Sequence, residues 1–503
     1  MKLQVTLDKM RRFSLLIAFL FCTDRVARLE AAVVHNLSSI FNNQPSKNWV
    51  ILVAGTNTWE SYRHQANVYH AYHIVRANKI PAENIITIAY DDIANNPKNP
   101  FKGKVFHDYE HKDVYKGVVI DYRGKDVKPY IFTMVMTGDE RLEKEGKKVL
   151  KSGPDDNVFI YYTGHGFRNY ITFPEGYLTA AQLNDILLHL YKKKKYNKLV
   201  FYMDACYSGS MVLDLIPPNV GIYVTTSANE KEESYGVFCT DKQIDVCLAT
   251  EYSYAWITDS EHSDLKKRTL EQQYQEVKKR TTLSHVMKYG EMVSQKNTRG
   301  EIQFYHQSIM KMSAFVDMSL SDLKKRTLEQ QYQEVKKRTT LSHVMKYGEM
   351  AMGSLPVEKF QGHYDLQMHQ NDEAKKVKVV DRKLSSRMHL FSISRRLMGA
   401  ATEEEHEAAW RNLHRALQLL HVVKDTVADI VRDVMIHHKP MVKRLPRWDE
   451  LMCFKAVFDQ FQTHCFTIQH VPGFAQLSVQ LMELCEAGYE VEATIKSLHR
   501  VCS

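Results

Sequence analysis

A cysteine and a histidine that could act together in catalysis each follow an apolar segment of the chain. Cys206 ends the run "KLVFYMDAC" (Lys198–Cys206), and the small-residue turn "YSGS" comes next. His165 lies near the end of "NVFIYYTGHG" (Asn157–Gly166). A thiolate is an effective nucleophile, and an adjacent imidazole can accept its proton or stabilise it as an ion pair. If the two runs are neighbouring strands, His165 and Cys206 face each other as a catalytic dyad.

The glycine after this histidine indicates how a transition state could be stabilised. Gly166 lets the backbone approach closely, so that its N–H and that of Cys206 can point at a developing oxyanion. The alternative for Cys206 is a buried structural thiol, because a free cysteine behaves as a small apolar side chain. The position of both residues at strand ends, each beside a glycine-containing turn, favours the catalytic interpretation.

The elements that must position this pair are short apolar strands between residues 48 and 260. These predicted strands are Trp49–Gly55, Ile85–Asp92, Asn157–Gly166, Lys198–Cys206 and Gly221–Asn229. Between the first two, "HQANVYHAYHIVRAN" (His64–Asn78) has apolar residues at helical spacing. The alternation predicts an open α/β sheet, and in such sheets ligands bind beyond the carboxyl ends of the strands.

The composition indicates a globular protein without a nucleic-acid partner. The 503 residues allow two or three domains, and the net charge of +9 is modest for this length. We find no recognition-helix pattern, zinc-finger spacing or alternation of aromatic and basic residues, so we expect no binding of nucleic acid. No metal-ligand spacing or nucleotide-binding loop is visible either, so we expect no metal and no cofactor.

The N-terminus has the pattern of an export signal. A basic segment precedes the apolar stretch Phe13–Cys22, which is too short to span a bilayer. We expect residues 1–31 to be a signal peptide and N-terminal extension; a buried N-terminal helix is the alternative. Export would make Asn36, in Asn-Leu-Ser, a glycosylation site. No other stretch is long and apolar enough to predict a membrane span.

The cysteines support a catalytic role for Cys206. One of the eight lies in the signal segment, and six others form two groups, Cys239 with Cys247, and Cys453, Cys465, Cys485 and Cys502. Pairing within each group gives three disulfides and leaves Cys206 alone. An unpaired cysteine in an oxidising compartment suggests a reactive thiol.

A repeated segment divides the chain. The 30 residues of Ser263–Met292 recur identically at Ser321–Met350. We therefore expect a peptidase-like domain at 32–292 and a duplicated insertion at 293–350. Only one copy can occupy a given place in a compact domain.

The rest of the chain is predicted to be a linker and a helical domain. Residues 351–392 are polar and basic. Thr402 and Glu405 have the spacing of a capping box. Apolar residues at helical spacing follow, namely Leu413, Leu417, Leu420, Val423, Val427, Ile430 and Val434. Residues 393–503 are thus expected to be all-α and disulfide-bonded.

Several motifs in order resemble the legumain family of asparaginyl endopeptidases. They include "WVILVAG", "YRHQAN", "HAYHIVRANKIP", "KVLKSG", "ACYSGSM" and "YVTTSANEKEESY". The resemblance runs from Trp49 to Met292, resumes at Phe360–Gly362 and continues through the C-terminal cysteines. It implies a caspase-like open sheet flanked by helices, followed by an all-α prodomain. It also implies a lysosomal or secreted protease with a digestive role such as haemoglobin degradation.

The resemblance implies specific roles for residues of the site. His165 and Cys206 would be the dyad, Gly166 and Cys206 the oxyanion hole, and Ser61 the support of the histidine. The S1 pocket would contain Arg63, His64, Asp204 and Ser234. An Asn side chain has one acceptor and a two-hydrogen donor, so its pocket needs both a cation and a carboxylate. Arg63 and Asp204 can provide them.

This chain departs from the family pattern around the site. Ser61 stands where legumains usually have Asn, and Asp204 replaces a Glu. Thr250 stands where a second carboxylate is expected, although Glu251 is adjacent and could move in. Gly164 replaces the Asp before the histidine. These changes leave hydrolysis possible but make strict Asn specificity uncertain.

The resemblance also implies regulation by acid. The helical domain would cover the site at neutral pH as an inhibitor and be released after cleavage of the linker, for which Asn371 is the candidate site. The histidines expected to respond are His406, His414, His421, His437, His438 and His464. The expected partners are protein and peptide substrates, the prodomain itself and cystatin-type inhibitors.

Two other functions fit the same residues. A ligase of this family would pass the thioester to an amine, and the dyad alone does not distinguish it from a protease. A weakened binding homologue would fit the changes at Ser61 and Thr250. A membrane-anchored transamidase with the same dyad fits less well, because it lacks the cysteine-rich helical domain.

Overall fold

The computed structural model describes residues 47–217, 219–265, 268–289, 381–441, 445–466 and 474–503. The predicted export signal, Asn36, Asn371, the duplicated insertion and most of the expected linker lie outside these residues.

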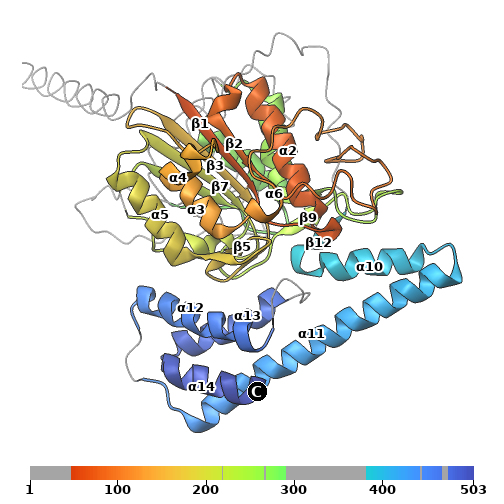
Figure 1. Cartoon of the computed structure of the whole chain (residues 1–503), viewed down its shortest axis with the longest axis vertical. Coiled ribbons are helices and arrows are strands. Elements are labelled where there is room, and N and C mark those ends of the chain that lie inside the picture. The colour runs from red at the N-terminus through yellow and green to blue at the C-terminus, as the bar shows by residue number, and fades with distance from the viewer. Residues whose placement is uncertain (1–46, 218, 266–267, 290–380, 442–444, 467–473) are drawn as a thin grey trace, which may run out of the picture. The chain divides into compact units, whose positions relative to one another are not determined.

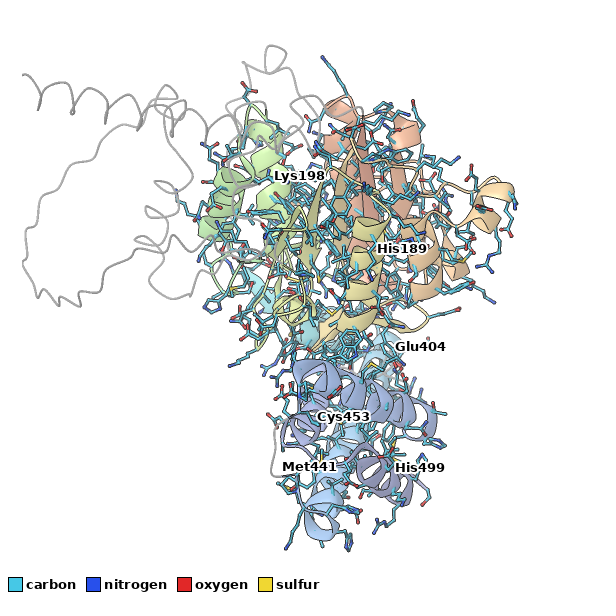
Figure 2. The ribbon with its side chains drawn as sticks, turned by 90° about the vertical axis from the view of Figure 1, so that its left-hand side faces the viewer. His189, Lys198, Glu404, Met441, Cys453 and His499 are labelled. Atoms are coloured by element: carbon cyan, nitrogen blue, oxygen red, sulfur yellow. A yellow bond between two sulfur atoms is a disulfide. The ribbon has the colours of Figure 1, made fainter. Side chains whose placement is uncertain are left out.

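A six-stranded sheet forms the centre of the first half of the chain (Figure 1). Its order is β11-β8-β7-β3-β1-β2, and its edge strand β11 is antiparallel to β8 whereas the other pairs are parallel. The strands are β1 (Asn48–Ala54), β2 (Ile85–Ile88), β3 (Asn157–Thr163), β7 (Lys198–Asp204), β8 (Ile222–Thr226) and β11 (Met287–Tyr289). Figure 2 labels Lys198 at the amino end of β7.

Helices cover both faces of this sheet (Figure 1). One face carries α2 (Tyr62–Ala77), α6 (Glu251–His262) and α7 (Leu270–Arg280); the other carries α3 (Pro129–Thr137), α4 (Glu140–Lys144) and α5 (Ala180–Lys192). Alternate strand residues face the two layers, because successive side chains of a strand point to opposite faces. Tyr161 packs edge-on against Trp256 of α6, whereas its neighbour Ile160 belongs to the core shared with Leu183 of α5.

Two small sheets and several short helices lie in the connections. One sheet contains β4 (Gly166–Phe167), β5 (Tyr170–Thr172) and β6 (Tyr177–Thr179); the other contains β9 (Tyr235–Val237), β10 (Ala249–Thr250) and β12 (Arg382–Leu384). The 3-10 helices are η1 (Trp59–Ser61), η2 (Ala82–Asn84), η3 (Gly124–Asp126), η4 (Ser208–Met211) and η8 (Ser385–Arg387).

The predicted open α/β sheet flanked by helices is confirmed. All five predicted strands and the predicted helix form, but most strands end two to four residues earlier than expected. The last residues of the predicted strands at Asn157–Gly166 and Lys198–Cys206 leave the ladder and carry the candidate catalytic pair. For example, β7 ends at Asp204, and Ala205 and Cys206 already belong to the turn that follows.

The first copy of the repeat is part of the fold, since it contributes α7 and β11. Thr269 and Gln272 form a capping box at the start of α7. The Tyr274 hydroxyl donates a hydrogen bond of 2.8 Å to the carbonyl of Val286, which fixes the connection into β11. The second copy lies outside the described residues.

The C-terminal part is helical, as predicted. It consists of α10 (Met388–Met398), α11 (Glu403–His437), α12 (Arg447–His464), α13 (Phe474–Glu486) and α14 (Val491–Cys502). The Thr402 hydroxyl accepts a hydrogen bond of 3.2 Å from the Glu405 N–H, so the predicted cap is present. Helix α10 spans the expected boundary at residues 392–393, so the helical region begins earlier than the sequence indicates.

The predicted apolar face of α11 is buried only in its second half. Val423, Val427, Ile430 and Val434 are buried, whereas Leu417 is 47% exposed. The buried half packs against α13 and α14, and it shares an apolar core with α12 and α13. The helical spacing of these apolar residues is confirmed, and their burial is largely confined to the second half.

The predicted pairing of cysteines is confirmed. Disulfides join Cys239 to Cys247, Cys453 to Cys485 and Cys465 to Cys502. The second bond ties α12 to α13, and Cys453 lies within the helical domain (Figure 2). Among the described cysteines, Cys206 is free.

Candidate active site

The backbone brings His165 and Cys206 to the same edge of the sheet, as predicted. Strands β3 and β7 are parallel neighbours, with Thr163 opposite Asp204. The chain stays paired one residue further, since the Gly164 N–H donates to the Asp204 carbonyl at 3.0 Å. The two candidate catalytic residues follow at once on the two strands, where open α/β sheets hold their ligands.

Two glycines are required by the close packing at this edge. A Cβ on Gly166 would lie 2.3 Å from the Cys206 carbonyl oxygen, so only glycine allows the two backbones to approach. A Cβ on Gly164 would lie 2.3 Å from the hydroxyl of Tyr162. That hydroxyl donates to the carbonyls of Thr172 at 2.6 Å and His165 at 3.2 Å. Tyr162 therefore holds the backbone of His165. The residue before this histidine is Gly164, at the position where the legumain resemblance leads us to expect an Asp.

The imidazole of His165 is held by Ser61 and by a second histidine. Its Nε2 lies 3.2 Å from the Ser61 hydroxyl, so Ser61 occupies the supporting position that was predicted for it. The ring packs edge-on against His64, with 5.1 Å between ring centroids. Burial lowers the pKa of His165 to about 3, and the positive charge of Arg63 and the nearby His389 add to this effect. The imidazole is thus neutral in this arrangement.

The thiol of Cys206 is covered, with 4% of the residue exposed. Its hydrogen bonds are with Ser234, whose N–H donates to Sγ at 3.4 Å and whose hydroxyl lies 3.7 Å from it. Burial raises the pKa of Cys206 to about 12, and the negative charge of Glu233 raises it further, against the effect of Ser234 and Arg63. The site therefore holds a neutral thiol and a neutral imidazole, not an ion pair.

Arg63 is buried with part of its guanidinium unpaired. Its Nη1 donates to the Glu60 carbonyl at 3.1 Å, but Nε and Nη2 are buried without a hydrogen-bond partner among the residues that the structure describes. Burial lowers its pKa to about 10, although the charges of Cys206 and Asp204 oppose this. Arg63 is 1% exposed, so it is not part of a surface salt bridge. Buried donors without partners are costly, so they point to a ligand that satisfies them.

Asp204 lies beside Arg63 at the end of β7 and is fully buried. Its Oδ2 accepts hydrogen bonds from the hydroxyls of Thr250 and Ser253. Burial raises the pKa of Asp204, and the hydroxyls and Arg63 only partly offset this. Thr250 thus contributes a donor where the family has a carboxylate.

Glu251 does not take the place of the missing carboxylate. Its Oε1 accepts from the Thr282 N–H at 3.1 Å and pairs with Arg382 of β12. The open question of whether Glu251 replaces that carboxylate is thus answered only for this arrangement, in which Glu251 is bound elsewhere. At the start of α6, its carboxylate faces the second part of the chain instead.

The other two predicted S1 residues also lie at this edge. The His64 Nδ1 is 2.8 Å from the Thr56 hydroxyl, and burial, Arg63 and His165 hold the pKa of His64 well below its ordinary value. Ser234 contacts both the Cys206 thiol and, at 3.2 Å, the hydroxyl of Ser385. All four predicted pocket residues are thus buried in one region with the dyad.

A segment that sequence reasoning treated as a linker covers this region. Strand β12 pairs antiparallel with β9, and the Ser385 N–H donates to the Ser234 carbonyl at 3.0 Å. The Met388 methyl group lies so close to Gly236 that a Cβ there would be 2.4 Å from it. We call residues 381–398 the covering segment. Through β12 and Met388 it packs against β9, which follows Ser234 and the neighbouring thiol.

Charged contacts hold the covering segment in place. The Arg396 guanidinium lies 2.5 Å from carboxylate oxygens of both Glu60 and Asp245. Arg395 donates to the carbonyls of Cys239 and Ile244, each at 2.9 Å. The sequence signal for these contacts was the pair of arginines after an apolar run. It could not reveal their acceptors, which lie about 150 and 340 residues earlier in the chain.

The helical domain also contacts the turn after β4. The ring of Tyr170 packs against Phe458 of α12, with 4.5 Å between centroids. Arg168 pairs with Glu486 at 2.7 Å, and Arg447 donates to Asn169 at 2.7 Å. The expected response of six histidines gains little support here, because His414, His421, His437 and His464 contact other residues of the helical domain.

Other kinds of site are not evident in the described residues. No group of three or more His, Cys, Asp or Glu side chains there could hold a metal ion. No described helix is long and apolar enough to cross a membrane. A cavity of about 690 Å³ lies between α3, α5 and Lys455, and none of the predicted site residues lines it.

Comparison with known proteins identifies the family. The model of the peptidase C13 family matches residues 48–305 and 298–363. The chain belongs to the peptidase C13 family. The haemoglobinase of Schistosoma japonicum is 37% identical over 454 residues, covering 90% of this chain and 92% of that protein. Human legumain is 33% identical over 464 residues, covering 91% of this chain and 93% of that protein.

The protein is thus a legumain-type cysteine endopeptidase of the C13 family, and its substrates are proteins or peptides. The predicted family is confirmed. Among solved structures, caspase-1 from Spodoptera frugiperda is similar over 48% of this chain and 80% of that one, with a TM-score of 0.30 and 8% identity.

Proposed function

We propose that the protein cleaves peptide bonds after Asn, and less often after Asp, through His165 and Cys206, and that it is made as a zymogen activated by acid. The observation that carries the specificity is the guanidinium of Arg63. It is buried, it has free donors, and it lies beside the buried carboxylate of Asp204. A P1 Asn carboxamide offers an acceptor to Arg63 and two hydrogens to Asp204.

Cleavage after Asp follows from the same two residues. A P1 carboxylate satisfies Arg63, but it opposes an ionised Asp204. Because burial raises the pKa of Asp204, acid favours its protonated form, which can donate to the substrate carboxylate. We therefore expect relative cleavage after Asp to increase as the pH falls.

The chemistry begins with removal of the covering segment. Exposure to water relieves the burial that raises the pKa of Cys206 and lowers that of His165, so the proton can pass from thiol to imidazole. The thiolate attacks the scissile carbonyl carbon, and the oxyanion receives hydrogen bonds from the N–H groups of Gly166 and Cys206. The His165 imidazolium then protonates the leaving amine. Water hydrolyses the resulting thioester and regenerates the thiol.

Inhibition before activation is supported by the contacts of the covering segment and helical domain. The segment pairs with β9, and Ser385 engages Ser234 next to the thiol. The helical domain would be an inhibitory prodomain, preceded by a linker cleaved at Asn371. The proposed segments remain residues 1–31, 32–292, 293–350, 351–392 and 393–503. The covering segment crosses the last of these boundaries, and we assign all of it to the inhibitory part.

The proposed location is the secretory pathway, leading to a lysosome or to secretion. The three disulfides support an oxidising compartment. The relatives named haemoglobinase suggest a digestive role in protein degradation.

The test is an acid-activated cleavage assay of the full-length protein. The proenzyme is held at about pH 4.5, where carboxylates and histidines gain protons. Hydrolysis of matched peptides with Asn, Asp, Gln or Ala at P1 is then compared. We expect cleavage after Asn, weaker cleavage after Asp, and none from Cys206→Ala.

Mass spectrometry of the chain in the same samples separates the possible failures. Cleavage after another P1 residue would contradict the proposed specificity but would leave the proposal of Cys206 as the nucleophile intact. Activity that persists in Cys206→Ala would contradict the dyad. No cleavage after confirmed loss of the helical domain would favour a weakened binding homologue.

A further inference from the structure

A chain of hydrogen bonds leads from the surface of α6 to the buried carboxylate of the proposed S1 pocket. The carboxylate of Glu261, whose side chain is 26% exposed, forms the outer end. We call the chain the Asp204 relay, and its members are Glu261, His70, His107, Asn67, Thr250 and Asp204.

The distances make the relay continuous. Glu261 Oε1 lies 2.9 Å from His70 Nε2, and His70 Nδ1 lies 2.8 Å from His107 Nδ1. His107 Nε2 lies 2.7 Å from Asn67 Oδ1, and Asn67 Nδ2 lies 2.7 Å from the hydroxyl of Thr250. That hydroxyl donates to Asp204 Oδ2.

The orientation of Asn67 fixes the direction of donation along the relay. Its Nδ2 donates to the hydroxyls of Thr250 and, at 3.0 Å, Thr163, and its Oδ1 accepts from the Thr250 N–H at 3.3 Å. An amide oxygen only accepts, so His107 must donate from Nε2. Burial, with the charge of His70, holds the pKa of His107 well below its ordinary value, so this ring is neutral and its Nδ1 accepts from His70.

The outer end of the relay is a hydrogen bond to a carboxylate. Glu261 Oε1 accepts from His70 Nε2 at 2.9 Å. Burial raises the pKa of Glu261, but the charge and hydrogen bond of His70, with Lys112 and His262, lower it to about 2. Glu261 therefore ends the relay as an ionised acceptor.

We propose that the Asp204 relay determines how strongly the protein prefers Asn over Asp at P1, by keeping the Thr250 hydroxyl turned toward Asp204. His70, His107 and Asn67 are positioning residues that act through Thr250. The proposal rests on the proposed role of Asp204 in the S1 pocket.

The physical reason is the number of donors to Asp204. Hydrogen bonds to a carboxylate favour its ionised form. If His107 no longer donates to Asn67, the Asn67 amide can turn over, and its oxygen then competes with Asp204 for the Thr250 hydrogen. Asp204 would lose one donor and bind its own proton more readily. Protonated Asp204 accepts poorly from a P1 Asn and donates well to a P1 Asp.

Other groups face the two ends of the relay and remain in place. Arg63 of α2, Tyr161 of β3 and Tyr252 of α6 act on Asp204, and the hydroxyls of Ser253 and Ser227 donate to it. At the other end, His73 is influenced by the charge of His70, and the ring of Tyr254 lies 5.5 Å from that of His107. Substitution of His107 or Thr250 leaves these groups unchanged.

The test compares selectivity in four variants of the activated enzyme. Thr250→Val removes the hydroxyl, His107→Leu removes the donor to Asn67, and their combination forms a double-mutant cycle. His107→Gln restores a donor. We expect each of the first two to lower the Asn-to-Asp ratio of kcat/KM about three- to tenfold at about pH 4.5, as for loss of one hydrogen bond. We also expect the acid limb of the pH profile of kcat/KM for the P1 Asn peptide to move to higher pH in these variants.

The cycle distinguishes the relay from a general loss of packing. Because His107 acts through Thr250, the double variant should match Thr250→Val, and His107→Gln should stay near the wild-type ratio. His73→Leu, on α2 with His70 and Asn67 but outside the relay, is the control for loss of a partly buried histidine. Additive effects, or a ratio in His107→Leu equal to that in His73→Leu, would overturn the proposal.

A second measurement does not depend on activity or on the folding of His107→Leu. Nitrogen-15 NMR of the full-length Cys206→Ala protein reads the histidine tautomers, with His70→Gln and His107→Gln used for assignment. We expect His107 to carry its proton on Nε2, the nitrogen that faces the Asn67 amide oxygen. A proton on His107 Nδ1 would refute the relay. Failure of the wild type to cleave after Asn would instead refute the proposed function.

Discussion

At the residue scale, the proposed specificity depends on the shape of one guanidinium. Arg63 is buried, two of its nitrogens have no hydrogen-bond partner among the described residues, and the charge of Asp204 acts on it. A planar fork can direct two N–H groups at one carboxamide oxygen in a fixed geometry, which an ammonium group cannot reproduce. The charge of residue 63 alone would therefore not be enough for recognition of Asn.

Arg63→Lys should lower kcat/KM for a P1 Asn peptide by about ten- to a hundredfold. The substitution keeps the charge near Cys206 but removes the fork. Steady-state kinetics with the activated variant measure the loss. Arg76→Lys, on the last turn of the same helix, is the matched control, because the Arg76 guanidinium donates to the carbonyl of Ile80 at 2.6 Å. An unchanged kcat/KM in Arg63→Lys would remove Arg63 from the pocket.

The dyad positions could be predicted from local sequence, but their partners could not. Cys206 and His165 stand out because each follows an apolar strand. The partners of Thr250 cannot be found in this way, because Asn67 lies 183 residues from it and the contact requires the packing of α2 against β10. Glu251 illustrates the same limit. It is adjacent to Thr250 in sequence, but its carboxylate pairs with Arg382.

At the element scale, the covering segment couples the site to pH. Burial lowers the pKa of His389 on α10, Glu60 opposes this effect, and Arg396 and Lys98 strengthen it. A released segment would have the ordinary value near 6.5. As the pH falls below that value, the released form takes up a proton that the docked form resists. Acid therefore favours release.

His389→Gln should move half-activation to a lower pH, by about 0.3 to 0.5 unit. The variant removes a group that takes up a proton only after release, so part of the acid dependence disappears. The measurement is the appearance of activity after incubation over a series of pH values. His421→Gln, which changes an exposed histidine of the helical domain, should leave the midpoint unchanged. A shift to higher pH in His389→Gln would contradict this role.

The elements of the sheet were predictable, whereas the covering segment was not. Buried parallel strands are continuous apolar runs that local sequence reveals. Polar and basic side chains of the covering segment, residues 381–398, bind Glu60, Glu233, Asp245 and Glu251. These acidic residues are scattered along the chain, so complementarity of charge is visible only after folding. The start of α10 at Met388 was missed for this reason.

At the scale of the whole molecule, the first copy of the repeat is integrated into the catalytic part. Helix α7 packs against α6, and β11 closes one edge of the sheet. Tyr274 is 2% exposed and its hydroxyl is bonded. The second copy has the same sequence but a different place in the chain.

Tyr274→Ala should lower the free energy of unfolding by about 2 to 4 kcal/mol, because it removes a large buried side chain. Tyr332→Ala changes the corresponding residue of the second copy and should alter stability by less than about 0.5 kcal/mol. Denaturant unfolding of both variants provides a matched comparison. Equal losses in the two variants would show that the first copy has no special place in the fold.

Because the two copies have identical side chains, the entropy of the chain decides which one completes the sheet. The first copy reaches α7 through residues 263–269 after α6, whereas Leu328 of the second copy would be reached through residues 263–327. By loop-closure scaling, the shorter connection into α7 is favoured by about 2 kcal/mol, and the longer return from the first copy to β12 (residues 290–381 against 348–381) offsets about 1 kcal/mol of this. Removal of residues 263–320 or of residues 293–350 leaves the same polypeptide. At the level of the gene, two different deletions would therefore encode the same chain with an uninterrupted catalytic part.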